Sequence, residues 1–249
     1  MFDLHAHILP RLDDGPETLE GSLELARAAV DDGITLMAAT PHVRDDYPTT
    51  ADAMERAVGE LRLRLDAATI PLELRPGGEV ALERLDLPAD ELRRFGLGGN
   101  PSYLLVETPY AGWPLDLEER LFRLQTVGLT PVLAHPERNA EVQADPEGRL
   151  RSLVERGTLI QLTAASVDGR LGRRVREAGK RLLDSGLAHL LASDAHAPSI
   201  RAVGLSAAAE AVADDALARW LTHDVPQAIL AAAELPERPR RKRRRWLSR

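Results

Sequence analysis

Short apolar segments with the length of buried strands recur along the chain, and segments whose apolar residues have helical spacing follow most of them. Strands that alternate with helices in this way predict a parallel sheet covered by helices. The expected strands span residues 2–5, 34–39, 71–75, 103–106, 131–134, 158–163 and 188–192. The expected helices span 17–31, 50–67, 117–127, 146–156, 171–185, 206–221 and 226–234, whereas 80–100 is less regular.

At six of the seven expected strands, a histidine, aspartate or glutamate lies at the end of the strand or within four residues after it. In a barrel of alternating strands and helices, the C-terminal strand ends share one mouth, whereas an open doubly wound sheet would not bring six of them together. We therefore expect an α/β fold, a distorted seven-stranded (β/α)7 barrel of the TIM-like type. The six stretches are Asp3-Leu4-His5-Ala6-His7, Thr40-Pro41-His42, Gly78-Glu79, Val106-Glu107, Ala134-His135-Pro136 and Ser193-Asp194-Ala195-His196.

Imidazoles and carboxylates at one shared mouth are typical ligands of divalent metal ions, and such ions catalyse hydrolysis. His5 and His7 lie two residues apart in an extended segment, so both imidazoles face the same way. Each stretch taken alone also has a structural explanation, such as a chance pair of histidines or a loop cap. Their shared placement favours a metallohydrolase. The two remaining histidines, His189 in a strand and His223 in a helical linker, are not expected to take part.

The chain contains no cysteine. This excludes disulfide bonds, thiolate metal sites and every mechanism that uses a cysteine nucleophile. A phosphatase built from this chain would therefore need another nucleophile, and a metal-activated hydroxide is the obvious one. Ligands that are all imidazole or carboxylate suit manganese, iron or zinc.

The charge of the chain is unevenly distributed, because residues 238–249 (RPRRKRRRWLSR) hold eight of the 32 basic residues and no acid. Residues 1–237 carry the other 24 against all 39 acidic residues, a formal charge of −15. We expect one folded domain over 1–235 and a basic, disordered tail over 236–249. The tail either solubilises the protein or attracts an anionic surface, with Trp246 as an interfacial anchor. Nucleic acid fits poorly with the acidic body. The chain shows neither a membrane span nor a signal peptide, which predicts a cytoplasmic location.

Four motifs together resemble the polymerase-and-histidinol-phosphatase (PHP) superfamily, and within it the bacterial capsule-associated tyrosine-protein phosphatases. They are DLHAHILPRLDDGP at 3–16, ATPH ending at His42, HPERN at 135–139 and SDAH at 193–196. The resemblance covers nearly the whole folded region, and the DDGP and HPER sequences are specific to this branch. The chain departs from the family at two positions, with Val43 where a second histidine is frequent and Arg11 where glycine is frequent.

The resemblance implies two or three divalent ions, most simply manganese, at the mouth of the barrel. Asp13 is the alternative to its neighbour Asp14, and Asp3 is expected to orient an imidazole rather than to bind an ion. By resemblance, one ion would be held by His5, His7, Glu79 and Asp194, a second by Asp14, His42 and His196, and a third by Glu79, Glu107 and His135, with Glu79 bridging.

The resemblance also implies hydrolysis of protein phosphotyrosine, with Arg138 and Arg201 on the substrate phosphate. The alternative for each is a surface arginine in an arginine-rich protein. The expected partner is a bacterial tyrosine autokinase that controls capsule or exopolysaccharide synthesis at the inner membrane face, where the basic tail would meet anionic lipid. One alternative is a histidinol-phosphatase-like phosphomonoesterase. Another is a silent metal-binding or nucleic-acid-binding protein, against which the intact ligand set argues. The sequence does not indicate an oligomeric state.

Overall fold

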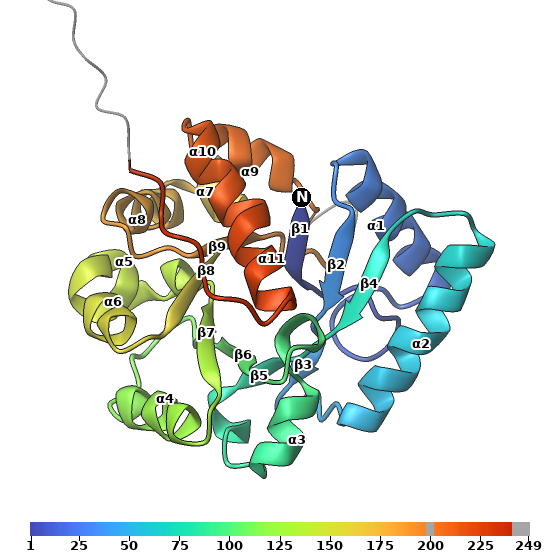
Figure 1. Ribbon diagram of the computed structural model, residues 1–249, viewed down its shortest axis with the longest axis horizontal. Helices are drawn as coiled ribbons and strands as arrows, with labels where there is room; N and C mark the ends of the chain where they lie inside the picture. Colours follow the sequence, from blue (N-terminus) through green and yellow to red (C-terminus); the bar gives the residue numbers. More distant parts are fainter. Residues whose placement is uncertain (198–201, 241–249) are drawn as a thin grey trace, which may run out of the picture.

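The computed structural model describes residues 1–197 and 202–240, and within them nine strands form two parallel sheets (Figure 1). The smaller sheet has the order β1-β2-β4 and the larger one the order β3-β5-β6-β7-β8-β9. The smaller sheet consists of β1 (Phe2–Ala6), β2 (Leu36–Ala39) and β4 (Glu73–Pro76). The larger sheet consists of β3 (His42–Val43), β5 (Glu79–Ala81), β6 (Tyr103–Glu107), β7 (Thr130–Ala134), β8 (Leu159–Thr163) and β9 (Leu190–Ala192).

Two of the expected strands are each followed by a further short strand that the sequence did not predict, and the breaks between them divide the strands into two sheets. The break between β2 and β3 falls at Thr40-Pro41, where proline cannot donate a ladder hydrogen bond. The break between β4 and β5 falls at Gly77-Gly78, and a side chain at Gly78 would come within 2.7 Å of the buried ring of Phe95. Beyond the breaks, β3 and β5 pair with His42 directly opposite Glu79.

The strand pairing does not close into one continuous sheet among residues 1–197 and 202–240, in contrast to the single seven-stranded barrel that we expected. The first strand and the segment after the last strand are nevertheless in contact. The Asp194 amide donates to the His5 carbonyl and the His7 amide donates to the Ala195 carbonyl, both at 2.8 Å. These two hydrogen bonds place the first strand beside the segment that follows the last strand.

Helices surround the two sheets (Figure 1). Five expected helices are present within two residues of their predicted bounds, among them two whose first turns are capped by Thr18 and Thr50. These five are α1 (Leu19–Asp31), α2 (Ala51–Ala67), α4 (Leu117–Thr126), α6 (Pro146–Glu155) and α8 (Arg173–Asp184). Short helices and turns that the sequence did not predict are α3 (Ala89–Arg94), α5 (Ala140–Ala144), α7 (Ala164–Asp168), η1 (Leu82–Arg84), η2 (Leu97–Gly99) and η3 (Pro136–Arg138).

The helix expected over 206–221 is interrupted. It is divided into α9 (Leu205–Ala211) and α10 (Asp215–Arg219), because Ala213 has a left-handed φ of 56° and Asp214 caps a new helix by accepting from the Leu217 amide. A π-helical turn, η4 (Trp220–Asp224), then leads into α11 (Val225–Leu230). No helix among the described residues combines the length and the apolar character needed to cross a membrane.

The segment at which the basic tail was expected to begin contacts the body of the protein. The Trp220 indole donates to the Pro236 carbonyl at 2.9 Å, and the Arg238 guanidinium donates to the carbonyls of Ala188 and Leu183 at 2.6 and 2.8 Å. The Arg238 guanidinium also lies over the Trp220 ring, 5.2 Å from the ring centre. Residues 241–249 of the expected tail, which include Trp246, are outside the described residues.

Candidate metal centre

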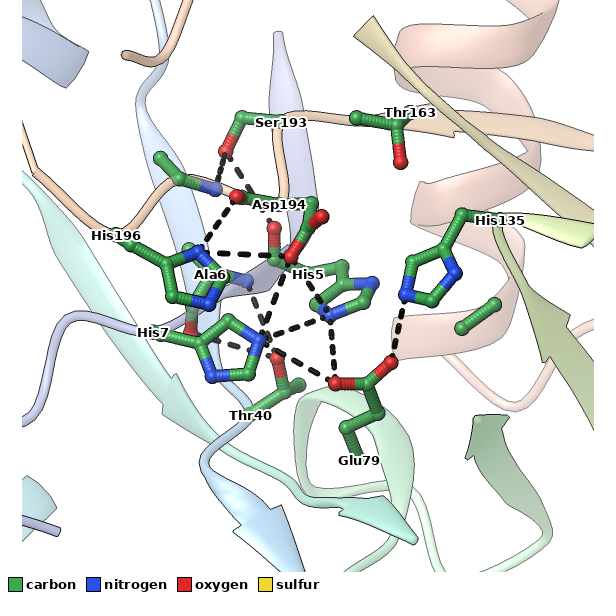
Figure 2. Close-up of polar contacts among 12 residues, drawn as sticks. His5, Ala6, His7, Thr40, Glu79, His135, Thr163, Ser193, Asp194 and His196 are labelled. Atoms are coloured by element: carbon green, nitrogen blue, oxygen red, sulfur yellow. Dashed lines mark hydrogen bonds and ion pairs between the residues drawn. The ribbon is translucent and has the colours of Figure 1, made fainter. Parts of the chain in front are cut away.

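All nine ligands expected from the sequence converge on one site. Eight of them lie within four residues of the C-terminal end of a strand, and Asp14 lies in the loop after β1. Figure 2 shows His5, His7, Glu79, His135, Asp194 and His196 of this set. They form four overlapping groups, and within each group the potential ligand atoms lie within 4.8 Å of one another. The groups are His7, Asp14, His42 and His196; His5, His135 and Asp194; His5, His7 and Glu79; and His42, Glu79 and Glu107.

The two histidines of the first strand have their outer ring nitrogens engaged. His5 Nδ1 lies 3.0 Å from Gln161 Oε1, and His7 Nδ1 lies 2.6 Å from Asp13 Oδ2. Because each oxygen accepts a hydrogen bond, each neutral ring carries its proton on Nδ1 and has a lone pair on Nε2. Both lone pairs are thus directed into the site, as metal ligands require.

Glu79 lies in the middle of the site (Figure 2). Its Oε1 is 2.9 Å from His135 Nε2, and its Oε2 is 3.4 Å from the Nε2 atoms of both His5 and His7. The side chain of Glu79 is completely buried, and only polar groups surround its oxygens. A carboxylate with both oxygens directed at several imidazoles is well placed to bridge two ions.

Asp13 and Asp14 have different environments. Asp13 Oδ2 accepts from His7 Nδ1 and from the His42 amide at 2.9 Å, so this carboxylate orients two candidate ligands. Asp14 Oδ1 lies 3.1 Å from His196 Nε2 and belongs to one of the four groups. The geometry therefore favours Asp14 over Asp13 as a ligand.

Two of the candidate ligands have backbone conformations that are uncommon for residues with side chains. His135 has a φ of 36° and Asp194 a φ of 52°. Such conformations cost about 1–3 kcal/mol each and occur preferentially at functional sites. Arg11 also has a positive φ, 64°, which explains why glycine is frequent at this position in the resembling family.

Arg138 lies at the edge of the site. Its guanidinium donates to Asp194 Oδ2 and lies 4.7 Å from the centre of the Tyr110 ring. The other expected arginine, Arg201, falls outside the described residues. One side of the Arg138 guanidinium is thus held by the candidate ligand Asp194.

Gln161 is a functional residue that the sequence reasoning missed. Its Oε1 accepts from His5 Nδ1 and, at 3.3 Å, from the His135 amide, so one amide side chain orients parts of two candidate ligands. Gln161 is fully buried in β8. This strand corresponds to the one expected strand, 158–163, that no expected ligand follows. A glutamine inside the apolar sequence LIQLT was the signal that could have revealed it.

Asp3, His189 and His223 make structural contacts. Asp3 was expected to orient an imidazole, but its carboxylate accepts instead from the backbone amides of His5 and Ser193. His189 accepts from the Ile160 amide at 3.1 Å, and His223 stacks on Phe2. Neither of these two histidines belongs to any of the four groups.

The electrostatics of the site favour the charged form of Glu79 and Asp194, whereas burial and the neighbouring Glu79 raise the pKa of Glu107. Although burial opposes ionisation, the neighbouring imidazoles of His5 and His135 hold the pKa of Glu79 well below its usual range. The pKa of Asp194 is likewise well below its usual range, because His5 and His7 outweigh its burial. Burial and the Arg138 charge lower the pKa of His135 to about 4, so this ring is neutral at pH 7.

The residues fit a cluster of divalent cations. His42 Nδ1 and Glu79 Oε2 are buried 3.0 Å apart, yet neither atom has a hydrogen bond. A buried polar atom without a partner is costly, and a cation between nitrogen and oxygen lone pairs would satisfy both atoms. The four carboxylates Asp14, Glu79, Glu107 and Asp194 balance the charge of two such ions.

The chain matches a protein-family model described as capsular polysaccharide synthesis, CpsB/CapC, over residues 1–231. Among curated proteins, it is 39% identical over 198 residues to the tyrosine-protein phosphatase YwqE of Bacillus subtilis, covering 79% of this chain and 77% of that protein. It is 32% identical over 197 residues to the putative tyrosine-protein phosphatase CapC of Staphylococcus aureus, with the same coverage of 79% and 77%.

A solved structure is also similar over nearly the whole chain. It comes from the crystal structures of YwqE from Bacillus subtilis and CpsB from Streptococcus pneumoniae, described as unique metal-dependent tyrosine phosphatases. The TM-score is 0.85 at 33% sequence identity, and the match covers 97% of this chain and all of the other.

Proposed function

The chain belongs to the CpsB/CapC family of capsular polysaccharide synthesis, and we propose that it is a metal-dependent phosphatase that hydrolyses phosphotyrosine in proteins. The observation that carries this proposal is the convergence of five histidines and four carboxylates at the strand ends of a chain without cysteine. The relatives named as tyrosine-protein phosphatases support the substrate class.

The proposed cofactor is a cluster of two or three divalent ions, with manganese first because oxygen and imidazole ligands suit it; iron and zinc are the alternatives. We assign one ion to His5, His7, Glu79 and Asp194, a second to Asp14, His42 and His196, and a third to Glu79, Glu107 and His135. Each assigned set shares at least two residues with one of the groups described above. When bound, such ions supply Lewis acidity and lower the pKa of water.

The side chains around the cluster have separate tasks in this proposal. Gln161 and Asp13 hold the imidazoles of His5 and His7 in one tautomer. Arg138 binds phosphate oxygens with the part of its guanidinium that Asp194 does not engage. A phenolate leaving group has a pKa of about 10, so the reaction requires no strong general acid. Arg201 is proposed as a second phosphate-binding arginine on the family resemblance alone.

We also propose that the two sheets together make up a distorted seven-stranded barrel. In this interpretation β2 with β3 and β4 with β5 are two interrupted strands, and the bonds between β1 and the segment after β9 complete the ring. The proposed barrel domain is residues 1–235, followed by the basic tail.

The proposed substrate protein is a tyrosine autokinase of capsule or exopolysaccharide synthesis at the inner membrane face. The family description supports the pathway. The eight basic residues of 238–249 would strengthen contact with anionic lipid there. Deletion of 241–249 is expected to weaken binding to anionic vesicles at low salt, and unchanged binding would contradict this part of the proposal.

The central experiment measures metal content and turnover of a phosphotyrosine peptide for the wild-type protein and His42→Ala. We expect bound divalent metal and turnover in the wild type and a loss of at least about 100-fold in kcat/KM in the variant. Histidinol phosphate serves as the comparison substrate, and faster turnover of it than of the peptide would contradict the assigned substrate class. Full turnover after chelation would contradict the mechanism.

A further inference from the structure

A hollow of about 370 Å³ lies beside the metal centre. Four lining residues are apolar or aromatic and four are charged: Ala81, Leu82, Pro109 and Tyr110, and Arg44, Asp46, Glu83 and Glu107. Glu107 belongs both to this lining and to one of the candidate ligand groups, so the hollow and the metal centre share a wall. A substrate whose phosphate lies at the ligands could therefore extend into the hollow without crossing another element.

Two parts of the lining carry the apolar and aromatic residues. Ala81 and Leu82 lie where β5 passes into η1, and Pro109 and Tyr110 follow β6. Tyr110 as a whole residue is 49% exposed. An exposed aromatic residue and an aliphatic side chain that line the same hollow are suited to a flat, apolar group.

The position of Tyr110 connects the hollow with the proposed phosphate site. Its ring centre is 6.0 Å from that of His135, and the Arg138 guanidinium lies over the ring at 4.7 Å. One face of Tyr110 is thus held by the arginine that would bind phosphate. A phosphate bound to Arg138 would bring the group it esterifies next to Tyr110.

Arg44 supplies a positive charge to the lining. Its guanidinium pairs with Glu107 at 3.3 Å and with Asp46 at 2.7 Å, and it lies 5.1 Å from the centre of the Tyr47 ring. A guanidinium fixed by two carboxylates can face an aromatic ring through a cation–π contact.

We propose that this hollow is the leaving-group pocket and binds the phenol ring of phosphotyrosine, with Tyr110 and Leu82 as its specificity-determining walls. The proposal rests on the phosphatase function proposed above and extends it. Offset or edge-to-face contacts between aromatic rings add to the burial of apolar area, whereas an alkyl phosphate would leave the hollow unfilled. The pocket would thereby favour aryl over alkyl phosphates.

The test uses two non-hydrolysable probes that differ only in the ring, phenylphosphonate and methylphosphonate. Their dissociation constants are measured by calorimetry on the full-length, manganese-loaded protein. We expect the wild type to bind phenylphosphonate about tenfold more tightly than methylphosphonate. Tyr110→Ala and Leu82→Ala should each reduce this preference about fivefold, and Tyr110→Phe should retain it.

Phe122→Ala is the matched control, because Phe122 is an exposed aromatic residue on α4 that does not line the hollow. It should leave the preference unchanged. The Leu82 variant separates ring binding from an indirect effect through Arg138, since Leu82 lies in η1 after β5 whereas Arg138 lies in η3 after β7. Equal weakening of both probes by Tyr110→Ala, together with no effect of Leu82→Ala, would overturn the proposal.

The two levels of the proposal fail in different ways. A wild type that turns over the phosphotyrosine peptide but binds both phosphonates equally would overturn the leaving-group pocket and leave the phosphatase function intact. A wild type that does not turn over the peptide with any of the divalent ions would overturn the phosphatase function. The pocket proposal would then fall with it.

Discussion

The Nε2 atoms of His5 and His7 lie 3.2 Å apart and face each other across the metal centre. Each ring has its Nδ1 atom engaged with an oxygen, of Gln161 in one case and of Asp13 in the other. Two lone pairs at this separation repel each other unless a proton or a cation lies close to both. The side chains are thus arranged for a positively charged occupant.

Removal of metal should therefore affect both turnover and stability. After treatment with a chelator and desalting, we expect loss of phosphotyrosine turnover and a lower thermal midpoint, and added Mn²⁺ should restore both. A ligand at 1,000 times its Kd stabilises the folded state by about 4 kcal/mol. Scanning calorimetry with a parallel turnover assay is the measurement. An unchanged midpoint and unchanged turnover would argue against a structural and catalytic metal cluster.

Replacement of Glu79 should have the largest effect of any single ligand, because its carboxylate lies near four imidazoles. Glu79→Gln should lower kcat/KM on a phosphotyrosine peptide by about 1,000-fold and reduce the bound metal, as measured by elemental analysis. Glu73→Gln is the control, since Glu73 is about half-exposed on β4. If the metal content of Glu79→Gln equals that of the wild type, Glu79 is not a ligand.

Gln161 should influence metal affinity without binding metal itself. Gln161→Leu keeps the approximate volume but removes the acceptor for His5 Nδ1 and the His135 amide. We expect metal affinity to fall by about 10- to 100-fold in titration calorimetry. Gln125→Leu serves for comparison, because Gln125 bonds only to the Arg156 carbonyl in an exposed position. Equal metal affinities of the two variants would show that Gln161 does not influence metal binding.

Arg138 should act on the phosphate and not on the metal. Arg138→Lys retains the positive charge but loses the planar fork that matches phosphate oxygens. We expect kcat/KM to fall by about 100-fold with the metal content unchanged. Arg149→Lys, at an exposed position on α6, should behave like the wild type. A parallel loss of metal in Arg138→Lys would indicate that the arginine mainly holds Asp194.

His189 should make stability depend on pH. Burial, followed by the nearby Arg238 charge, lowers its pKa to about 4, whereas the unfolded value is about 6.5. The neutral ring therefore stabilises the folded state above pH 6.5, and this contribution is lost as the pH falls from 6.5 towards 4. The effect is of the order of 2 kcal/mol, allowing for partial exposure.

The variant His189→Asn keeps an acceptor for the Ile160 amide but cannot titrate. Its free energy of unfolding, measured in urea at several pH values, should fall less steeply than that of the wild type between pH 6.5 and 4. Parallel curves for the two proteins would show that His189 does not carry this pH dependence.

The parallel α/β fold and the convergence of the nine candidate ligands could be predicted from the sequence, because strand-end polar residues mark the carboxyl edge of a parallel sheet. The short strands β3 and β5 beyond the breaks could not, since two and three residues are too few to show a strand pattern in the sequence. The division of the helix at Ala213 was also missed. Alanine favours helix, but here it has a left-handed conformation.

Within the site, the sequence indicated which residues could bind metal but not what orients them. Gln161 was overlooked because a glutamine carries no motif, and only the structure places its amide beside two ligands. Tyr110 and Arg44 were overlooked because their role depends on a hollow formed by separate loops. Asp3 was expected to orient an imidazole, but its carboxylate accepts from the backbone amides of His5 and Ser193. The second of these partners is 190 residues away in the sequence.

The backbone bonds that join His5 and His7 to Asp194 and Ala195 have a consequence for biosynthesis. A growing polypeptide cannot complete the ligand set until its last contributor, His196, has left the ribosome. The proposed metal centre can therefore be complete only in chains that are synthesised beyond this residue. Products that end before Asp194 would carry the earlier histidines without the last two ligands of the set.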